Sequence, residues 1–182
     1  MEKNIVKYCS PALAGLKTAN MFSYRFESVD KLLAELYAAN EKLNEKGVFV
    51  EILRISEAKA LVYVYRKKML EADLNRKEVQ MLLKDFGYQG SRPEKCLERL
   101  KGRLLQYECF PHEIGLFLGY PIQDVSGFIQ QKGKNYKCRG PWKVYGNESE
   151  AKRLFQKLEK CSRVYNQLFA VGRSITQLTV AA

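Results

Sequence analysis

Hydrophobic and polar positions follow two different periods in the first part of the chain. Residues 20–26 alternate aromatic and polar side chains, which is the period of a half-buried strand. From Ser28 to Leu43 the apolar residues recur at the spacing of one helical face, and serine is a favourable residue at a helix start. Residues 48–55 and 60–65 are rich in β-branched and aromatic side chains and enclose a short polar segment. The pattern therefore predicts a strand, a helix and a β-hairpin, in that order.

After Arg66 the pattern becomes mainly helical. Apolar residues at helical spacing, bounded by glycine and proline, predict helices over residues 67–73, 76–86, 93–107, 111–118, 121–131 and 149–169. Residues 114–118 are also compatible with a strand, residues 142–145 predict a short strand, and a last short element is expected over residues 175–180. No internal repeat, low-complexity tract or linker interrupts the chain. We therefore expect one α+β domain over residues 1–182, with a small, mostly antiparallel sheet packed with several helices.

Near the N-terminus, Ser10 and Pro11 have the form of a helix cap and a first helical residue. They predict a short helix that ends near Gly15. Cys9 would then lie just before the helix, where the helix dipole and unpaired backbone N–H groups lower the pKa of a thiol and favour the thiolate.

Composition restricts the class of protein. No run approaches the roughly 20 apolar residues that a membrane helix needs, and the first residues lack the apolar region of a secretion signal. We therefore expect a cytoplasmic protein without a membrane partner; the oligomeric state is left open. The five cysteines include no C-x-x-C pair, which argues against a disulfide framework and a tetrahedral zinc site, and most are expected to be reduced and structural. Motifs for nucleotide hydrolysis, Rossmann cofactors and zinc proteolysis are also missing, so no metal and no cofactor are predicted.

Positive charge is concentrated in the second half of the chain. The net charge is +11, of which residues 1–89 contribute +3 and residues 90–182 contribute +8. Such a balance favours acidic partners such as nucleic acid or phosphorylated ligands, through an attraction that salt screens. Lysines that serve only solubility would give the same balance.

The clearest cluster of cations is residues 132–143, which we call the basic segment. It contains no acidic residue and interleaves cations with aromatic side chains, a composition that in nucleic-acid binders pairs phosphate contacts with base stacking. The residues expected to bind are Lys132, Lys134, Lys137, Arg139, Trp142 and Lys143. A solvated basic loop without a ligand is the alternative interpretation. The preceding helix, residues 121–131, lacks the cations that a major-groove recognition helix carries.

Several motifs taken together resemble a known family. They are residues 9–18 (CSPALAGLKT), residues 111–121 (PHEIGLFLGYP), residues 124–129 (DVSGFI), residues 142–145 (WKVY) and Cys161. These motifs are similar to those of the bacterial domain-of-unknown-function family 3793, found mostly in anaerobic Firmicutes, and the resemblance runs essentially from end to end. It implies a small, stand-alone intracellular bacterial protein and supplies no activity.

The only histidine, His112, suggests a thiol-dependent hydrolase or transferase. In this hypothesis Cys9 is the nucleophile, His112 the base or ion-pair partner, and Lys17 an anion contact. The two segments also resemble, loosely, cysteine peptidases and amidases of the NlpC/P60 kind, from which they depart by Pro11 in place of glycine, a later glycine after the histidine and a long separation. The group that orients the imidazole is not assigned, with Glu113 and Asp124 as candidates.

Two further interpretations of these residues remain open. Cys9, Cys161 and His112 include the ligand types that suit iron, haem or copper, although no local spacing such as C-x-x-C-H supports such a site. Alternatively, His112 and Glu113 belong to the first turn of a helix and Cys9 is a small buried apolar residue.

Overall fold

The computed structural model describes residues 1–106 and 110–181, and the contacts of the chain group into two compact units. Unit 1 comprises Met1–Leu70 together with the residues from Lys160 onward, and unit 2 comprises Glu71–Glu159. The expectation of a single domain over the whole chain stays a prediction.

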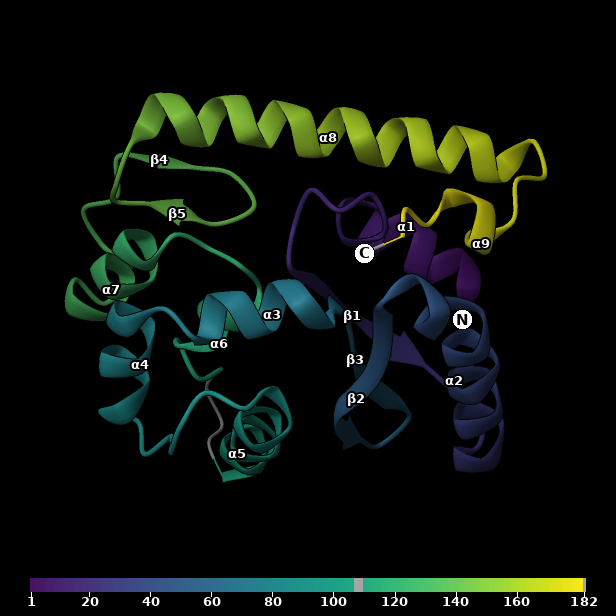
Figure 1. The fold of residues 1–182 in the computed structure, drawn as a ribbon, viewed down its shortest axis with the longest axis horizontal. Coiled ribbons are helices and arrows are strands. Elements are labelled where there is room, and N and C mark those ends of the chain that lie inside the picture. The colour runs from purple at the N-terminus through teal and green to yellow at the C-terminus, as the bar shows by residue number, and fades with distance from the viewer. Residues whose placement is uncertain (107–109, 182) are drawn as a thin grey trace. The chain divides into compact units, whose positions relative to one another are not determined.

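Unit 1 is built on a three-stranded antiparallel sheet in the order β1-β3-β2 (Figure 1). The strands are β1 (Ala19–Arg25), β2 (Val48–Ser56) and β3 (Lys59–Arg66). The hairpin of β2 and β3 and the strand before it are therefore confirmed, with one irregularity of register between Ile52 and Arg54.

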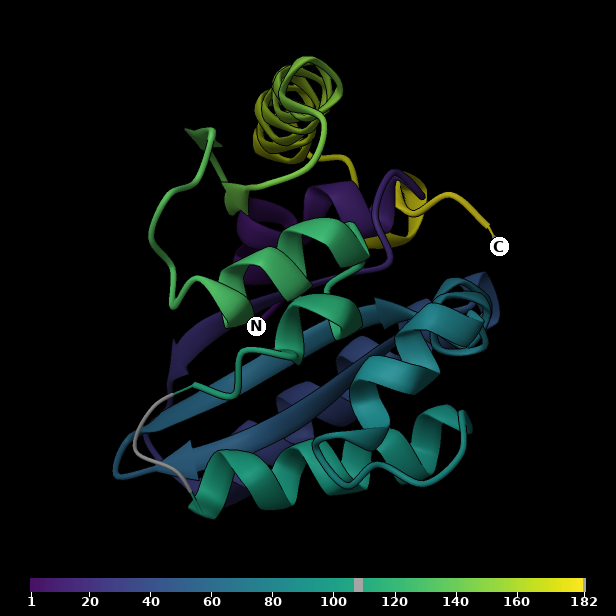
Figure 2. The same cartoon turned by 90° about the vertical axis from the view of Figure 1, so that its left-hand side faces the viewer.

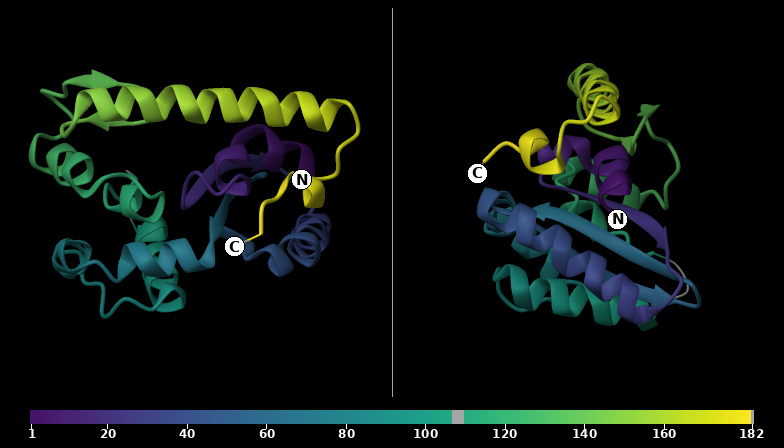
Figure 3. Two further views of the ribbon diagram at one scale, coloured as in Figure 1. Left: turned by 45° about the horizontal axis from the view of Figure 1, so that its top comes forward. Right: turned by 90° about the vertical axis from the view of Figure 1, so that its right-hand side faces the viewer.

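Helices α1 (Glu2–Leu13), α2 (Val29–Leu43) and α9 (Ile175–Leu178) enclose the core of unit 1 with the sheet. Figure 3 shows α2 lying along the sheet. The predicted cap of α2 is confirmed, because the Ser28 side chain accepts a hydrogen bond from the backbone N–H of Lys31 at 3.2 Å. A 3₁₀ turn, Asn44–Lys46, follows α2 and ends at Gly47, whose φ of 73° suits a residue without a Cβ. Apolar side chains from these helices and strands form one core. It includes Ile5, Val6, Cys9, Leu13, Phe22, Leu32, Val50, Val62, Val64 and Ile175.

The prediction of a helix beginning at Ser10 is wrong. Helix α1 begins at Glu2 and runs through Pro11 to Leu13, so Cys9 lies inside it rather than ahead of it. The helix continues because Ile5, Cys9 and Leu13 recur at one-turn spacing and are fully buried, and this burial outweighs the backbone hydrogen bond that proline cannot donate. The Ser10 hydroxyl bonds the carbonyl of Val6, as serines inside helices do.

Arg66 joins the end of α1 to the end of β3. It is 3% exposed; its Nε donates to the carbonyl of Ala12, and its guanidinium also donates to those of Leu13 and Val180, each at 2.6 Å. The bonds to Ala12 and Leu13 satisfy carbonyls that the end of α1 leaves without an intrahelical partner. Burial lowers the pKa of Arg66.

Unit 2 is mainly helical. Its elements are α4 (Lys77–Lys84), α5 (Pro93–Gln106), α6 (Ile114–Phe117), α7 (Ile122–Gln130), the paired strands β4 (Cys138–Arg139) and β5 (Lys143–Val144), and the first part of α8 (Glu148–Ala170). Helix α3 (Lys67–Leu74) and helix α8 each begin in one unit and end in the other. Figure 2 shows α6 and α7, which contact each other.

The sequence predictions for unit 2 are largely confirmed. Residues 114–117 are helical, which excludes the alternative strand, and the strand expected over residues 142–145 is β5. The sequence did not predict its partner β4. The expected end of α5 at Tyr107 lies outside the described residues. The helices and the small antiparallel sheets confirm the α+β class.

Across the described parts of the chain, none of the helices combines the length and the apolar character needed to cross a membrane.

Candidate functional site

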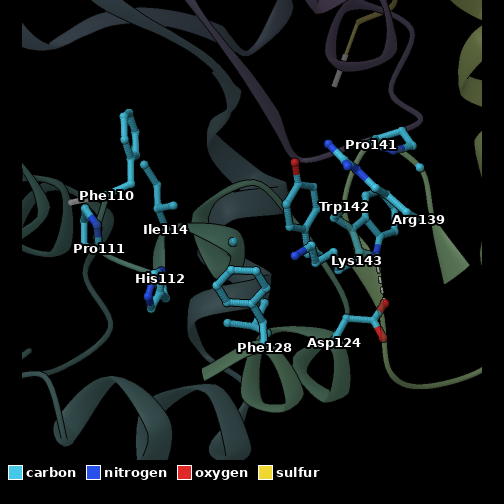
Figure 4. Close-up of a pocket in the computed structure, with 14 residues that line it drawn as sticks. Phe110, Pro111, His112, Ile114, Asp124, Phe128, Arg139, Pro141, Trp142 and Lys143 are labelled. Atoms are coloured by element: carbon cyan, nitrogen blue, oxygen red, sulfur yellow. Dashed lines mark hydrogen bonds between the residues drawn. The ribbon is translucent and has the colours of Figure 1, made fainter. Parts of the chain in front are cut away.

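A pocket of about 320 Å³ lies within unit 2. Its lining comes from three segments: residues 110–115, which lead into and begin α6; Tyr120 with helix α7; and the hairpin of β4 and β5 (Figure 4). The lining residues that carry rings or charges are Phe110, His112, Tyr120, Asp124, Phe128, Arg139, Trp142 and Lys143. The pocket therefore brings His112 together with three residues of the basic segment, two features that lie far apart in the sequence.

Asp124 of α7 fixes the hairpin in place. Its carboxylate is 4% exposed; Oδ2 accepts a hydrogen bond from Trp142 Nε1 at 2.7 Å, and Oδ1 accepts from the backbone N–H of Tyr145 at 2.7 Å and of Gly146 at 2.8 Å. These three donors satisfy the hydrogen-bonding needs of the buried carboxylate. Asp124 therefore serves as the anchor of the pocket wall, because both of its oxygens are occupied by the hairpin.

Trp142 forms a rigid part of the wall. It stacks on Tyr120 with ring centroids 4.5 Å apart and meets Phe155 of α8 edge to face at 4.6 Å. Gly140 permits this packing, since a Cβ there would overlap the Phe155 ring. The sequence predicts that Trp142 stacks on a base. The side chain is only 8% exposed, however, so it lacks the open ring face that such stacking needs.

The open aromatic surface of the pocket belongs to other residues. His112 is exposed and meets the half-buried Phe128 edge to face, with ring centroids 4.9 Å apart. Phe110, 40% exposed, comes from the same turn as His112. Figure 4 shows His112 on one side of Phe128 and Lys143 on the other.

Two cations complete the lining. Lys143 donates from Nζ to the carbonyl of Gly133 at 2.8 Å and lies over the rings of Tyr136, at 4.9 Å, and Phe128, at 5.7 Å. Arg139 is exposed, and within the described residues it has no ion-pair partner. Neither cation is neutralised by a carboxylate of the described chain, so both can meet an anion.

The other cations of the basic segment lie outside the lining. Lys132 and Lys134 are exposed, and Lys137, also exposed, donates from Nζ to the carbonyl of Gly146 at 2.7 Å. Lys132 has a φ of 51° and Gly133 a φ of 72° in the turn that ends α7. The carbonyl of Gly133 accepts from Lys143, so this turn is tied directly to the pocket.

Glu113 is not among the pocket residues, although it follows His112 in the sequence. It is fully buried, and its Oε1 accepts hydrogen bonds from Arg103 of α5 and from Tyr88, the latter at 3.1 Å. Its Oε2 has no partner among the described residues. Burial, reinforced by the neighbouring Glu113, raises the pKa of Tyr88. The buried pair of Glu113 and Arg103 therefore anchors the turn that presents His112.

Cys9 and Lys17 belong to unit 1. Cys9 is fully buried inside α1, and burial raises the pKa of its thiol. Lys17 is 9% exposed, and burial lowers its pKa to about 8, while its electrostatic interaction with Cys9 acts in the opposite direction. A buried, neutral thiol is the environment of a structural cysteine rather than a reactive one.

The described cysteines other than Cys9 add no second site. Cys9, Cys96, Cys138 and Cys161 are free, and Cys109 lies outside the described residues. In the described ranges, no group of three or more His, Cys, Asp and Glu side chains is placed to hold a metal ion.

Sequence reasoning named His112, Arg139, Trp142 and Lys143, which line the pocket, but it missed the structural roles of Asp124 and Phe128. Phe128 forms the wall between His112 and Lys143, and Asp124 anchors Trp142. A signal for Asp124 was present, because it is the last acidic residue before a long run that carries only cations.

The comparisons with known proteins identify a family. The model of a family described as "Protein of unknown function (DUF3793)" matches residues 5–179. No curated protein and no solved structure matches the chain.

Proposed function

The chain belongs to the DUF3793 family of proteins of unknown function, and we propose that it acts as a binding protein whose unit 2 holds a nucleotide in its pocket. The base lies against the wall formed by Phe110, His112 and Phe128. The phosphate binds Arg139 and Lys143. The binding involves no catalytic step.

One observation carries this proposal: an apolar, aromatic wall faces two cations that no described carboxylate neutralises. Burial of an apolar ring in such a pocket is favourable by the hydrophobic effect and by stacking. The guanidinium of arginine matches the paired oxygens of a phosphate. An anion with a flat ring satisfies both halves of the site, and a nucleotide is such an anion.

Pocket size supports the same class of ligand. A volume of about 320 Å³ lies at the lower end of the range of about 300–1,000 Å³ found for sites of small molecules and cofactors. It suits one ring system with one phosphate.

The thiol hydrolase hypothesis has less support. Cys9 lies inside a helix and is fully buried, so the N-terminal helix dipole that would lower its pKa does not act on it, and burial raises that pKa instead.

The single tryptophan gives a direct assay. Because Trp142 lines the pocket and is the only tryptophan, its fluorescence reports on this site alone. Uridine and adenosine monophosphates should change it saturably at low salt. Arg139→Ala should weaken binding by about tenfold, the loss expected for one charge-assisted contact.

Lys157→Ala is the matched control, because Lys157 is an exposed lysine of the same unit and the substitution removes the same charge. It should leave the affinity within about twofold, as expected for surface charges outside the site. Calorimetry of the same titrations detects a ligand that binds without changing the Trp142 fluorescence. If neither method detects binding at millimolar nucleotide, or if the two variants lose affinity equally, the proposal is wrong.

A further inference from the structure

We infer that the nucleotide in the pocket is part of a single-stranded nucleic acid, whose neighbouring phosphates bind Lys132, Lys134 and Lys137. This inference rests on the proposed function and names the class of its ligand.

The first ground is the surplus of cations beside the pocket. A free nucleotide engages Arg139 and Lys143 and leaves the other three cations of the basic segment without a role. From Val125 to Asn147 the chain contains no Asp or Glu, so no acidic residue of this run neutralises them. The nearest acid before the run, Asp124, is buried and occupied by Trp142 and two backbone N–H groups.

The second ground is the position of these cations. Lys132 and Lys134 flank Gly133, whose carbonyl accepts a hydrogen bond from Lys143 of the pocket at 2.8 Å. Gly133 also packs on Phe128, since a Cβ there would lie 3.0 Å from that ring. The turn with the two exposed lysines therefore borders the pocket, so a strand with one nucleotide in the pocket passes over them.

Lys137 extends the same surface. Its backbone N–H donates to the carbonyl of Val144 at 2.8 Å and its Nζ to that of Gly146 at 2.7 Å, which fixes it on the hairpin that carries Arg139 and Lys143. The ammonium group has three N–H donors, and one is used in this bond. The others remain available for a phosphate.

The pocket geometry selects a single strand over a duplex. A base can enter a pocket only when it is unpaired and unstacked, which is the usual mode of sequence-tolerant binding to single strands. Helix α7, which precedes the basic segment, carries no Lys or Arg. It therefore lacks the phosphate and base-edge contacts of a helix that enters the major groove.

The dependence of affinity on salt concentration should differ between a strand and a free nucleotide. For single strands, log K falls against log salt with a slope of about −0.7 for each phosphate contact. The pocket phosphate and three neighbouring phosphates give about −2.8, and the single phosphate of a free nucleotide gives at most about −0.7. At 0.1 M salt the three additional contacts should strengthen binding of the strand about 100-fold over the nucleotide.

The test compares three probes: uridine monophosphate, a ten-residue oligouridylate and a ten-base-pair RNA duplex. Each is titrated across a salt series with Trp142 fluorescence and calorimetry. Lys132→Gln/Lys134→Gln should weaken oligouridylate binding about 25-fold at 0.1 M salt and reduce its slope by about 1.4. Uridine monophosphate binding should change by less than about twofold, because Arg139 and Lys143 remain.

Lys95→Gln/Lys157→Gln is the control, since it removes two exposed lysines of unit 2 outside the basic segment. It should leave both affinities and both slopes unchanged. Equal affinity and slope for the nucleotide and the oligomer would overturn the inference while the proposed function stands, and so would a preference for the duplex. If none of the three probes binds, the proposed function itself is wrong.

Discussion

Asp124→Asn should destabilise unit 2 by about 3 kcal/mol. Three donors meet the buried carboxylate, and hydrogen bonds to a charged group contribute about 1.5–3 kcal/mol each. Asparagine can still accept from Tyr145 and Gly146, at the lower strength of a neutral bond. Its amide N–H groups, however, face the indole N–H of Trp142, which leaves two buried donors opposed and costs about 1–3 kcal/mol.

A double-mutant cycle with Trp142→Phe isolates this contact. Phenylalanine keeps an aromatic ring beside Tyr120 but removes the N–H donor, so Trp142→Phe alone should cost about 2 kcal/mol. In Asp124→Asn/Trp142→Phe the opposed donors are gone, and the loss should fall short of the sum of the two single losses by more than about 1 kcal/mol.

Urea unfolding followed by far-ultraviolet circular dichroism measures all four proteins. Trp142 fluorescence adds a reading from unit 2 for the two proteins that retain the indole. A loss below about 1 kcal/mol for Asp124→Asn, or additivity within about 0.5 kcal/mol, would refute Asp124 as the anchor of the pocket wall.

Three other predictions concern Lys17, Cys9 and Gly140. Burial lowers the pKa of Lys17 in the folded chain from 10.5 to about 8, so between these pH values the unfolded chain binds more protons and the free energy of unfolding rises with pH. Urea titrations at pH 8 and pH 9 should therefore show that the free energy of unfolding of the wild type rises by about 1 kcal/mol more than that of Lys17→Met. The same pH dependence in both proteins would contradict the lowered pKa. Cys9 is fully buried, and burial raises the pKa of its thiol. Peptide mass spectrometry should therefore show that Cys9 is alkylated far more slowly in the native protein than in urea, and that His112→Ala does not change the native rate. Fast alkylation of native Cys9 would restore the thiol hypothesis. Gly140→Ala should lower the free energy of unfolding by about 1–3 kcal/mol, because its Cβ would overlap the Phe155 ring. Urea unfolding should show this as a lower midpoint, and an unchanged midpoint would show that the ring moves freely.

Most elements of the fold follow from local signals in the sequence. The Ser28 cap, the apolar face of α2 and the two β-rich runs each act within a few residues, and all three predictions are confirmed. The start of α1 was mispredicted because the local signal of Ser10 and Pro11 competes with the burial of Ile5, Cys9 and Leu13, and the burial dominates.

The site was predictable only in pieces. Composition singled out His112 and the basic segment separately. That residues of both line one pocket depends on how α7 packs against the hairpin of β4 and β5. The bonds of Asp124 to Trp142, Tyr145 and Gly146 span 18–22 residues and leave no local pattern. Pairing Cys9 with His112 rested on a helix start that is absent at Cys9.

The most direct test of nucleotide binding in this pocket is the indole N–H signal of Trp142 in a ¹H–¹⁵N correlation spectrum. As the chain has one tryptophan, this signal is a single resolved reporter at the pocket wall. Nucleotide binding in the pocket predicts that uridine monophosphate shifts it saturably in the wild type, and that Arg139→Ala requires about tenfold more ligand for the same shift. A signal that stays in place while other resonances move, or that moves equally in both proteins, would contradict binding in this pocket.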